Sequence, residues 1–276
     1  YYAHHDKEDD KVALAIREHY QPRYAGDELP STPESLAVAL ADKIETLTGL
    51  FGIGQLPTGE KDPFALRRHA LGILRLLIEK ELPLSLDNLI AIGTEEESVV
   101  PGVKDATEEL KQFFHDRLRV MQKDQGFTAH EVESVIGSEP AILADVPKRL
   151  KAVHDFMSLP EAESLAAANK RIENILKKNT LPLADAVDPA LLTEKEEKDL
   201  YEAIRTLEPK LEADYKAGRY EDELRSLAPL KAPVDAFFDK VMVNAEDEAL
   251  RRNRLTLLNE LHKAMNQVAK LSCLAS

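Results

Sequence analysis

Residues 42–79 read DKIETLTGLFGIGQLPTGEKDPFALRRHALGILRLLIE, and this stretch guides the interpretation of the whole chain. Apolar residues recur at helical spacing at both of its ends, which predicts two amphipathic helices. The connection between them, FGIGQLPTGEKDP at 51–63, is rich in glycine. Connections between helices usually have about two to eight residues, so we expect this longer one to have a specific role.

Helical patterns continue on both sides of this stretch. Apolar residues keep helical spacing over 9–20, 104–123, 161–178 and 246–271, and no segment shows the convincing alternation of a β-strand. The chain also repeats signals that are typical of helix starts, namely an N-cap residue followed by proline or, three residues later, by glutamate. These pairs are Thr32 with Pro33, Asp62 with Pro63, Thr128 with Glu131, and Thr193 with Glu196. The sequence therefore predicts an all-α protein.

The composition limits the class of protein. The chain has 276 residues, 43% of them hydrophobic and 31% charged, which is typical of a folded, helix-rich protein. No apolar run approaches the length of a membrane span, so we expect no contact with a membrane. Cys273 is the only cysteine, and this favours a reducing cytoplasm. Because the chain opens on two tyrosines without an initiator methionine, we expect it to be a fragment of a longer protein.

The net charge of −14 is the wrong sign for a protein that wraps nucleic acid through overall charge. Local basic faces can still bind phosphates on an acidic protein. Breaks in the helical pattern lie near 94–102 (TEEESVVPG) and around Pro160. Any nucleic-acid interface must therefore be sought on particular helix faces.

The sequence partly matches two motifs of enzyme active sites, but it completes neither of them. Residues 54–61 (GQLPTGEK) come close to a phosphate-binding loop, but Glu60 stands where that motif has its lysine. His5 and Asp6, with the distant Asp42, suggest the metal-binding pattern of helical HD phosphohydrolases, although a further ligand is missing. Scattered surface residues are the alternative explanation.

Basic residues gather on the polar faces of several predicted helices. On a helical wheel Arg68 and Arg75 fall opposite the apolar stripe of 65–79, with Arg67 at its edge. Such a basic face can bind phosphate groups, or it can simply be the solvent-exposed side of the helix. The densest basic face belongs to the predicted helix over 161–178 and consists of Lys170, Arg171, Asn174, Lys177 and Lys178. Arg149 lies nearby in sequence.

Arg254 is exceptional because it falls within the apolar stripe of the last helix. A buried guanidinium must be paired with a carboxylate or used to bind a ligand. Both alternatives, an internal ion pair and a ligand groove, remain open from the sequence.

Several strings resemble the C-terminal half of the beta subunit of bacterial heterotetrameric glycyl-tRNA synthetase. They are HYQPRYAGDELP (19–30), ALADKIETLTGLFGIGQLPTGEKDPFALRRHALGILRLLIE (39–79) and DEALRRNRLTLL (247–258). SLAAANKRIENILKKN (164–179) and EALRRNRLTLL (248–258) are similar to the DALR-type anticodon-binding domain shared with arginyl-tRNA synthetase. The DALR tetrad corresponds to Glu248-Ala249-Leu250-Arg251, with glutamate in place of aspartate.

The resemblance implies a fold and a function. It implies the later part of an HD-like helical domain at 1–100, connecting helices at 101–149 and an anticodon-binding helical bundle at 150–276. It also implies recognition of tRNA(Gly) within a complex of two alpha and two beta subunits. Glycine activation with ATP and Mg²⁺ would belong to the alpha subunit, so we expect no catalytic residue, metal or cofactor in this chain, although it is part of a ligase.

The expected RNA-binding residues combine these basic faces with the start of the last helix. They are Arg67, Arg68, Arg75, Arg149, Lys170, Arg171, Asn174, Lys177, Lys178, Arg251, Arg252 and Arg254. Two alternatives compete with tRNA recognition. One is a fragment of an HD-type metal-dependent phosphohydrolase, and the other is a helical scaffold for subunit assembly without RNA contacts.

Overall fold

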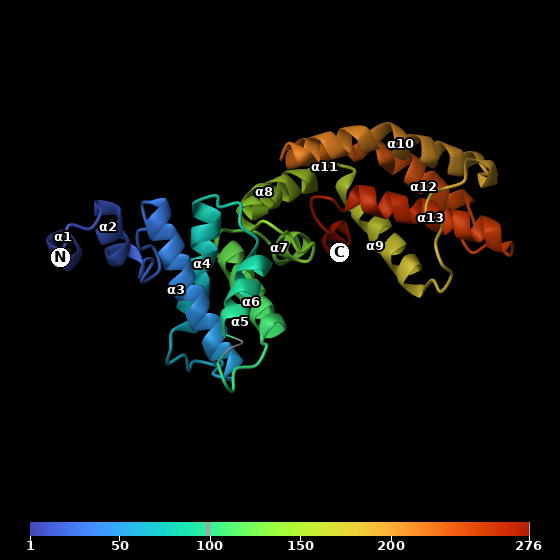
Figure 1. The fold of residues 1–276 in the computed structure, drawn as a ribbon. Coiled ribbons are helices and arrows are strands. Elements are labelled where there is room, and N and C mark those ends of the chain that lie inside the picture. The colour runs from blue at the N-terminus through green and yellow to red at the C-terminus, as the bar shows by residue number, and fades with distance from the viewer. Residues whose placement is uncertain (98–99, 276) are drawn as a thin grey trace. The chain divides into compact units, whose positions relative to one another are not determined.

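The protein is built from helices joined by loops in the residues that its computed structural model describes, 1–97 and 100–275, and within these it has no β-strand (Figure 1). The all-α prediction is confirmed. The chain forms two compact units, Tyr1–Gln125 with Pro140–Val146, and Gly126–Glu139 with Pro147–Ser276. The chain thus leaves the first unit, returns to it for a short segment and leaves it again.

The first unit is built around the long helix α3 (Pro33–Gly52), which packs against α2, α4, α5 and α6. Leu47 of α3, Ile73 and Leu77 of α4, and Phe114 of α6 have no exposed surface and form its core. Burying each such side chain contributes about 1.5–3 kcal/mol to stability. The other elements are α1 (Tyr2–His5), α2 (Asp10–Glu18), α4 (Leu66–Glu79), α5 (Leu86–Glu97), α6 (Thr107–Asp124) and the 3-10 helix η1 (Leu143–Asp145).

Helix α3 begins as its sequence predicts. Thr32 is the N-cap, its hydroxyl accepts a hydrogen bond from the Ser35 amide, and Pro33 occupies the first helical position.

The start of α4 differs from the prediction. The helix begins at Leu66 rather than directly after Asp62 and Pro63, because Ala65 adopts a left-handed backbone conformation with φ 54°. Asp62 nevertheless satisfies the first amides, since its carboxylate accepts hydrogen bonds from the backbone nitrogens of Leu66 (2.8 Å) and Arg67 (3.0 Å). The aspartate acts as a cap from outside the helix.

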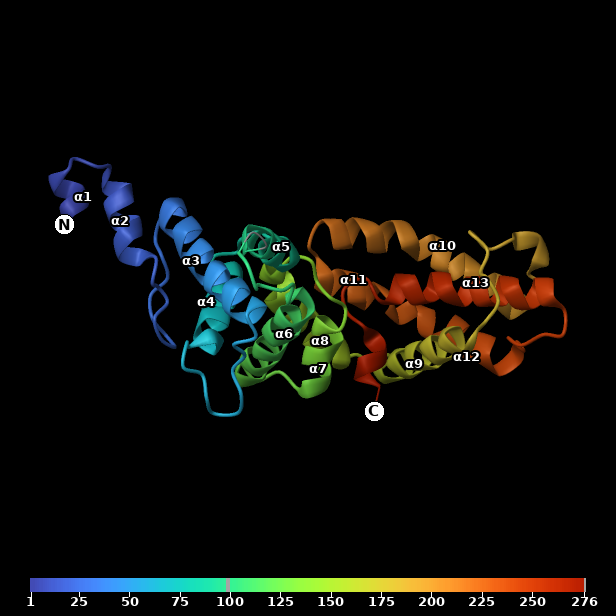
Figure 2. The same ribbon diagram turned by 60° about the horizontal axis from the view of Figure 1, so that its bottom comes forward.

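The second unit gathers α9, α10, α12 and α13, with α13 packed against both α9 and α10 (Figure 2). Its core includes Leu200, Phe237, Leu257, Leu261 and Met265, all without exposed surface. Its elements are α7 (Ala129–Ile136), α8 (Val146–Met157), α9 (Ala162–Lys178), η2 (Pro189–Leu191), α10 (Lys195–Lys216), α11 (Tyr220–Ser226), η3 (Ala228–Leu230), α12 (Lys231–Lys240), α13 (Glu248–Met265) and η4 (Leu271–Leu274).

One of two predicted capping boxes in this unit is confirmed and one is displaced. Thr128 and Glu131 form the box that opens α7. At α10 the predicted pair of Thr193 with Glu196 is wrong by one position, since Glu194 is the N-cap and Glu197 is its partner. Glu197 has no exposed surface, and its carboxylate accepts hydrogen bonds from the backbone nitrogens of Thr193 and Glu194 (2.8 Å each).

The predicted boundary at 94–102 includes residues 98 and 99, which lie outside the described residues. The three-part division at 100 and 149 therefore stays a prediction. Among the described residues, no helix combines the length and apolar character needed to cross a membrane.

Candidate nucleic-acid interface

The helix that carries the densest basic face, α9, is fixed in the second unit by its apolar side. Leu165, Ala166 and Ile172 have no exposed surface. They belong to the side of α9 that is buried where the helix packs against α12, α13 and η4. Since the buried side fixes the rotation of the helix, its opposite side faces solvent and carries the exposed residues Lys170, Arg171, Asn174, Lys177 and Lys178.

Four of the five predicted residues on α9 line one shallow hollow of about 440 Å³. Their exposed side chains bring two ammonium groups, a guanidinium and an amide to the same surface. The remaining lining residues are small or apolar. The complete lining is Lys170, Arg171, Asn174 and Lys178, with Ala167, Ile175 and Ala275.

Arg171 is positioned by an aromatic ring of α12. Its guanidinium carbon lies 4.1 Å from the centre of the Phe238 ring, within the range of a cation–π interaction. Phe238 is not among the residues predicted from the sequence. The available signal was the Phe237-Phe238 pair, because Phe237 is fully buried and its neighbour lies about 100° further around the helix.

Lys170 and Lys178 differ in their anchoring. The Lys170 ammonium donates to the backbone carbonyl of Ala275 at 3.3 Å, whereas Lys178 has no hydrogen-bond or ion-pair partner among the described residues. Neither lysine has a carboxylate partner there. The hollow therefore presents positive charge that the protein itself does not neutralise.

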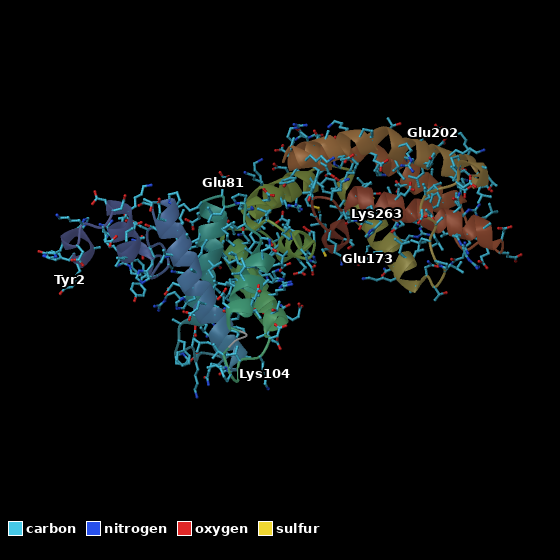
Figure 3. The ribbon with its side chains drawn as sticks, viewed as in Figure 1. Tyr2, Glu81, Lys104, Glu173, Glu202 and Lys263 are labelled. Carbon is cyan, nitrogen blue, oxygen red and sulfur yellow. The ribbon has the colours of Figure 1, made fainter. Side chains whose placement is uncertain are left out.

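Lys177, the fifth predicted residue of α9, belongs to a separate ion-pair group around Glu173, which is labelled in Figure 3. Its ammonium lies 2.6 Å from Glu173, whose carboxylate is also 3.1 Å from Lys270. Burial alone would raise the pKa of Glu173, but hydrogen bonds from Lys177, Ser272 and Lys270 outweigh it and lower the pKa to about 2. Lys177 is thus engaged within the protein.

Arg149 of α8 is buried, with 6% of its surface exposed. Its guanidinium donates to the carbonyls of Gln267 and Val268 and to the Tyr215 hydroxyl at 2.9–3.2 Å. It also lies 4.9 Å from the centre of the Tyr220 ring. These contacts give Arg149 an internal, structural role, and an RNA contact by this side chain stays a prediction.

The arginines of α13 are also engaged within the second unit. Arg252 donates to Glu248 one turn earlier (3.0 Å), and Arg251 reaches the carbonyl of Ala245 (3.4 Å). Arg254 is buried and forms an ion pair with Glu197, which is the first of the two alternatives that the sequence left open. It also donates to the Met242 carbonyl at 2.8 Å.

The three arginines predicted on the polar face of α4 do not share one exposed basic surface. Arg67 donates to the Gly59 carbonyl at 2.7 Å and so closes the glycine-rich connection onto the helix. Arg75 is largely covered, with 19% of its side chain exposed, and donates to Glu79 and to the Asp27 carbonyl. Only Arg68 is exposed without a hydrogen-bond or ion-pair partner among the described residues.

The residues of the HD-like pattern are placed as follows. His5 Nδ1 lies 3.1 Å from the carboxylate of Asp6 at the exposed start of the chain. Asp42 is half-buried on α3. The described residues contain no group of three or more histidine, cysteine, aspartate or glutamate side chains that could hold a metal ion.

The comparisons with known proteins agree with this architecture. The model of the family described as DALR anticodon binding domain matches residues 165–272, which include α9 from Leu165 onward and the whole of α12 and α13. By class, this part of the second unit is therefore a helical domain of the DALR anticodon-binding type. The family model described as Glycyl-tRNA synthetase beta subunit matches residues 1–137.

Curated relatives cover the whole chain. The glycine–tRNA ligase beta subunit of Delftia acidovorans is 55% identical over 280 residues, which is 100% of this chain and 39% of the relative. Those of Leptothrix cholodnii and Nitrosomonas eutropha are 55% and 50% identical, again over 100% of this chain and over 38% and 40% of their own length. The chain belongs to the glycyl-tRNA synthetase beta-subunit family and spans about 39% of the length of its relative from Delftia acidovorans.

Proposed function

We propose that this chain is the tRNA(Gly)-recognition portion of a glycine–tRNA ligase beta subunit, and that the hollow on α9 contacts the RNA. The hollow lies within the part of the chain that matches the anticodon-binding domain. The observation that carries the proposal is the convergence of Lys170, Arg171 and Lys178 there without a carboxylate partner among the described residues.

The chemistry of this surface suits an RNA loop. Ammonium and guanidinium groups bind phosphates, while exposed planar groups stack on unpaired bases. The Phe238 ring supports one face of the Arg171 guanidinium, and the Asn174 amide can both donate to and accept from a base edge. Since the protein carries a net charge of −14, the surface attracts RNA locally while the rest of the molecule repels it.

The names of the relatives support a proposal for the wider function. The relatives named glycine–tRNA ligase beta subunit support the proposal that this chain contributes RNA binding to such a ligase. We propose that it acts in the cytoplasm in a complex of two alpha and two beta subunits, in which the alpha subunit holds ATP and Mg²⁺ and activates glycine. In that complex the basic hollow orients the tRNA, and the bond-forming chemistry occurs elsewhere.

The test is a comparison of two double charge reversals. Arg171→Glu with Lys178→Glu alters the hollow, whereas Lys198→Glu with Lys263→Glu makes the same change of charge at exposed lysines of α10 and α13. Affinity for a tRNA(Gly) transcript is measured by fluorescence anisotropy at several salt concentrations. Charge-assisted hydrogen bonds contribute about 1.5–3 kcal/mol each, so we expect the first variant to bind roughly tenfold or more weakly.

The salt dependence provides a second readout. Each lost phosphate contact reduces the slope of log affinity against log salt by about 0.7–0.9. The control variant should change affinity and slope much less. Equal weakening in the two variants would show that only overall charge matters, and it would rule out the hollow as the binding surface.

A further inference from the structure

A second hollow lies in the first unit, between the segment that follows α2 and the facing helices α3 and α4. Its volume is about 240 Å³. Charged side chains dominate it, and all but one of these are basic or, like histidine, able to become so. The lining residues are Tyr20, Pro22, Arg23, Asp42, Lys43, Ala65, Arg68 and His69.

Lys43 is a buried cation, with 2% of its surface exposed. Its ammonium donates to the His19 carbonyl at 3.0 Å and has no ion-pair partner among the described residues. Its side chain passes directly over Gly72 of α4, where a Cβ atom would lie 3.1 Å from the lysine Cε. An ammonium buried without an opposing charge is costly, and an anion in the adjacent hollow would offset that cost.

Two further polar groups that line the hollow beside Lys43 have no hydrogen-bond partner among the described residues, namely the Nδ1 atom of His69 and the guanidinium of Arg68. The Nδ1 atom of His69 is buried and has no hydrogen-bond partner. Arg68 is exposed and unpaired among the described residues. Burial, followed by the neighbouring charge of Lys43, lowers the pKa of His69 and so favours the neutral ring, which can donate from one nitrogen.

The remaining charges leave the hollow positive. Arg23 is held by Asp27 through hydrogen bonds of 3.0 and 3.2 Å. Asp42 is the acidic residue of the lining, and its charge opposes one of the two cations that remain. A carboxylate in this place can accept a hydrogen bond from a hydroxyl group of a ligand.

We propose that this hollow binds the phosphate group of a small phosphomonoester. Lys43 and Arg68 donate to the phosphate oxygens, His69 donates from Nδ1, and Asp42 accepts from a hydroxyl of the attached group. A hollow of about 240 Å³ has room for a phosphate and a neighbouring sugar. This site belongs to the first unit and is separate from the α9 hollow, so it does not depend on the proposed tRNA contact there.

The experiment follows the His69 ring by ¹H–¹⁵N NMR while inorganic phosphate or AMP is added to the 276-residue chain. Ionic strength is kept constant with chloride. We expect saturable shifts of the His69 signals and an upward shift of its titration when phosphate is bound. AMP should bind more tightly than inorganic phosphate, since only AMP supplies a ribose hydroxyl that Asp42 can accept from while the phosphate oxygens contact Lys43 and Arg68.

Two variants and a control make the test specific. Arg68→Gln should weaken the binding of both ligands roughly tenfold, as expected for the loss of one charge-assisted contact. Gly72→Ala should also weaken it, because the added methyl group displaces Lys43, while alanine favours the helix and keeps the protein folded. Lys80→Gln removes an exposed charge beyond the far end of α4 and should leave binding unchanged.

Three results would overturn the proposal. The first is the absence of any His69 shift with either ligand. The second is an equal affinity of Arg68→Gln and Lys80→Gln. The third is a His69 shift that tRNA causes but that neither inorganic phosphate nor AMP causes. That result would assign these cations to an RNA-binding surface instead of a site for a small phosphate ester.

Discussion

The Arg254 guanidinium donates from Nε to the carboxylate of Glu197, and both side chains are buried, with 7% and 0% of their surface exposed. The pair joins the start of α10 to the middle of α13. Because the same carboxylate accepts from the backbone nitrogens of Thr193 and Glu194, it caps one helix while it neutralises the other helix's arginine.

Removing one member of this pair should strongly destabilise the second unit. Arg254→Met leaves a buried carboxylate without its counter-charge, and such a loss costs about 3–5 kcal/mol. Native-state hydrogen exchange of amides in α10 and α13 measures the change in the free energy of unfolding. Arg252→Met is the matched control, because Arg252 pairs with Glu248 at the surface, where an ion pair contributes at most about 1 kcal/mol. Similar costs for the two variants would contradict this account.

Glu223 should make the stability of the second unit depend on pH. Its carboxyl group is fully buried, and neither oxygen has a hydrogen-bond partner. Burial, and then the charge of Asp214, raises its pKa to about 8, although Arg149 and Lys210 act in the opposite direction. The ordinary pKa of 4.5 applies to the unfolded chain, so between these values the folded state holds one more proton. The contribution of Glu223 to stability is complete below pH 4.5 and is lost as the pH rises through about 8.

Glu223→Gln removes this dependence. Relative to the parent, the variant should gain stability as the pH is raised from about 5 to 8, by a few kcal/mol at roughly 1.4 kcal/mol per pH unit. Urea unfolding followed by circular dichroism at several pH values measures the difference. Glu202→Gln, an exposed substitution on α10, should show no such trend. A difference between Glu223→Gln and the parent that stays constant with pH would rule out the raised pKa.

Asp62 should stabilise the start of α4 through its carboxylate. Asp62→Ala removes the hydrogen bonds to the amides of Leu66 and Arg67, and the loss of a cap typically costs about 1 kcal/mol. Asp62→Asn keeps an acceptor oxygen and should cost less. Hydrogen exchange at the first amides of α4 distinguishes the two variants, and equal protection in both would contradict the role of the cap.

Local signals along the chain were sufficient to predict much of the fold. Thr32 with Pro33, and Thr128 with Glu131, act through atoms a few residues apart, so their geometry follows from sequence spacing alone. The wheel position of Arg254 also indicated burial correctly. Its partner could not be identified, because Glu197 lies 57 residues earlier and contacts it only once the helices pack.

Tertiary contacts explain where the sequence was misleading. The capping box of α10 is displaced by one residue to the position at which its glutamate also meets Arg254. Arg75 lies opposite the apolar stripe of its helix, but the backbone of Asp27, 48 residues earlier, covers it. On α9 the basic face was visible as a pattern, while the ring of Phe238 beneath Arg171 depends on the packing of α12.

The Arg171–Phe238 contact leads to a prediction about coupling in RNA binding, which depends on the function proposed for the α9 hollow. The ring holds the guanidinium by an interaction of about 0.5–2 kcal/mol, so its loss frees Arg171 to adopt other rotamers. We expect Phe238→Leu to weaken tRNA(Gly) binding severalfold, although the ring itself does not line the hollow.

A double-mutant cycle tests whether Phe238 acts through Arg171. If the ring only orients the arginine, Phe238→Leu should have little further effect in the Arg171→Gln background, since the group that it orients is already absent. Fluorescence anisotropy with the tRNA(Gly) transcript gives the four affinities, and circular dichroism verifies that each variant is folded. Additive effects would mean that Phe238 influences RNA binding independently of Arg171, and the positioning role would then be wrong. Strong coupling would show that the α12 ring sets the orientation of a charge on α9.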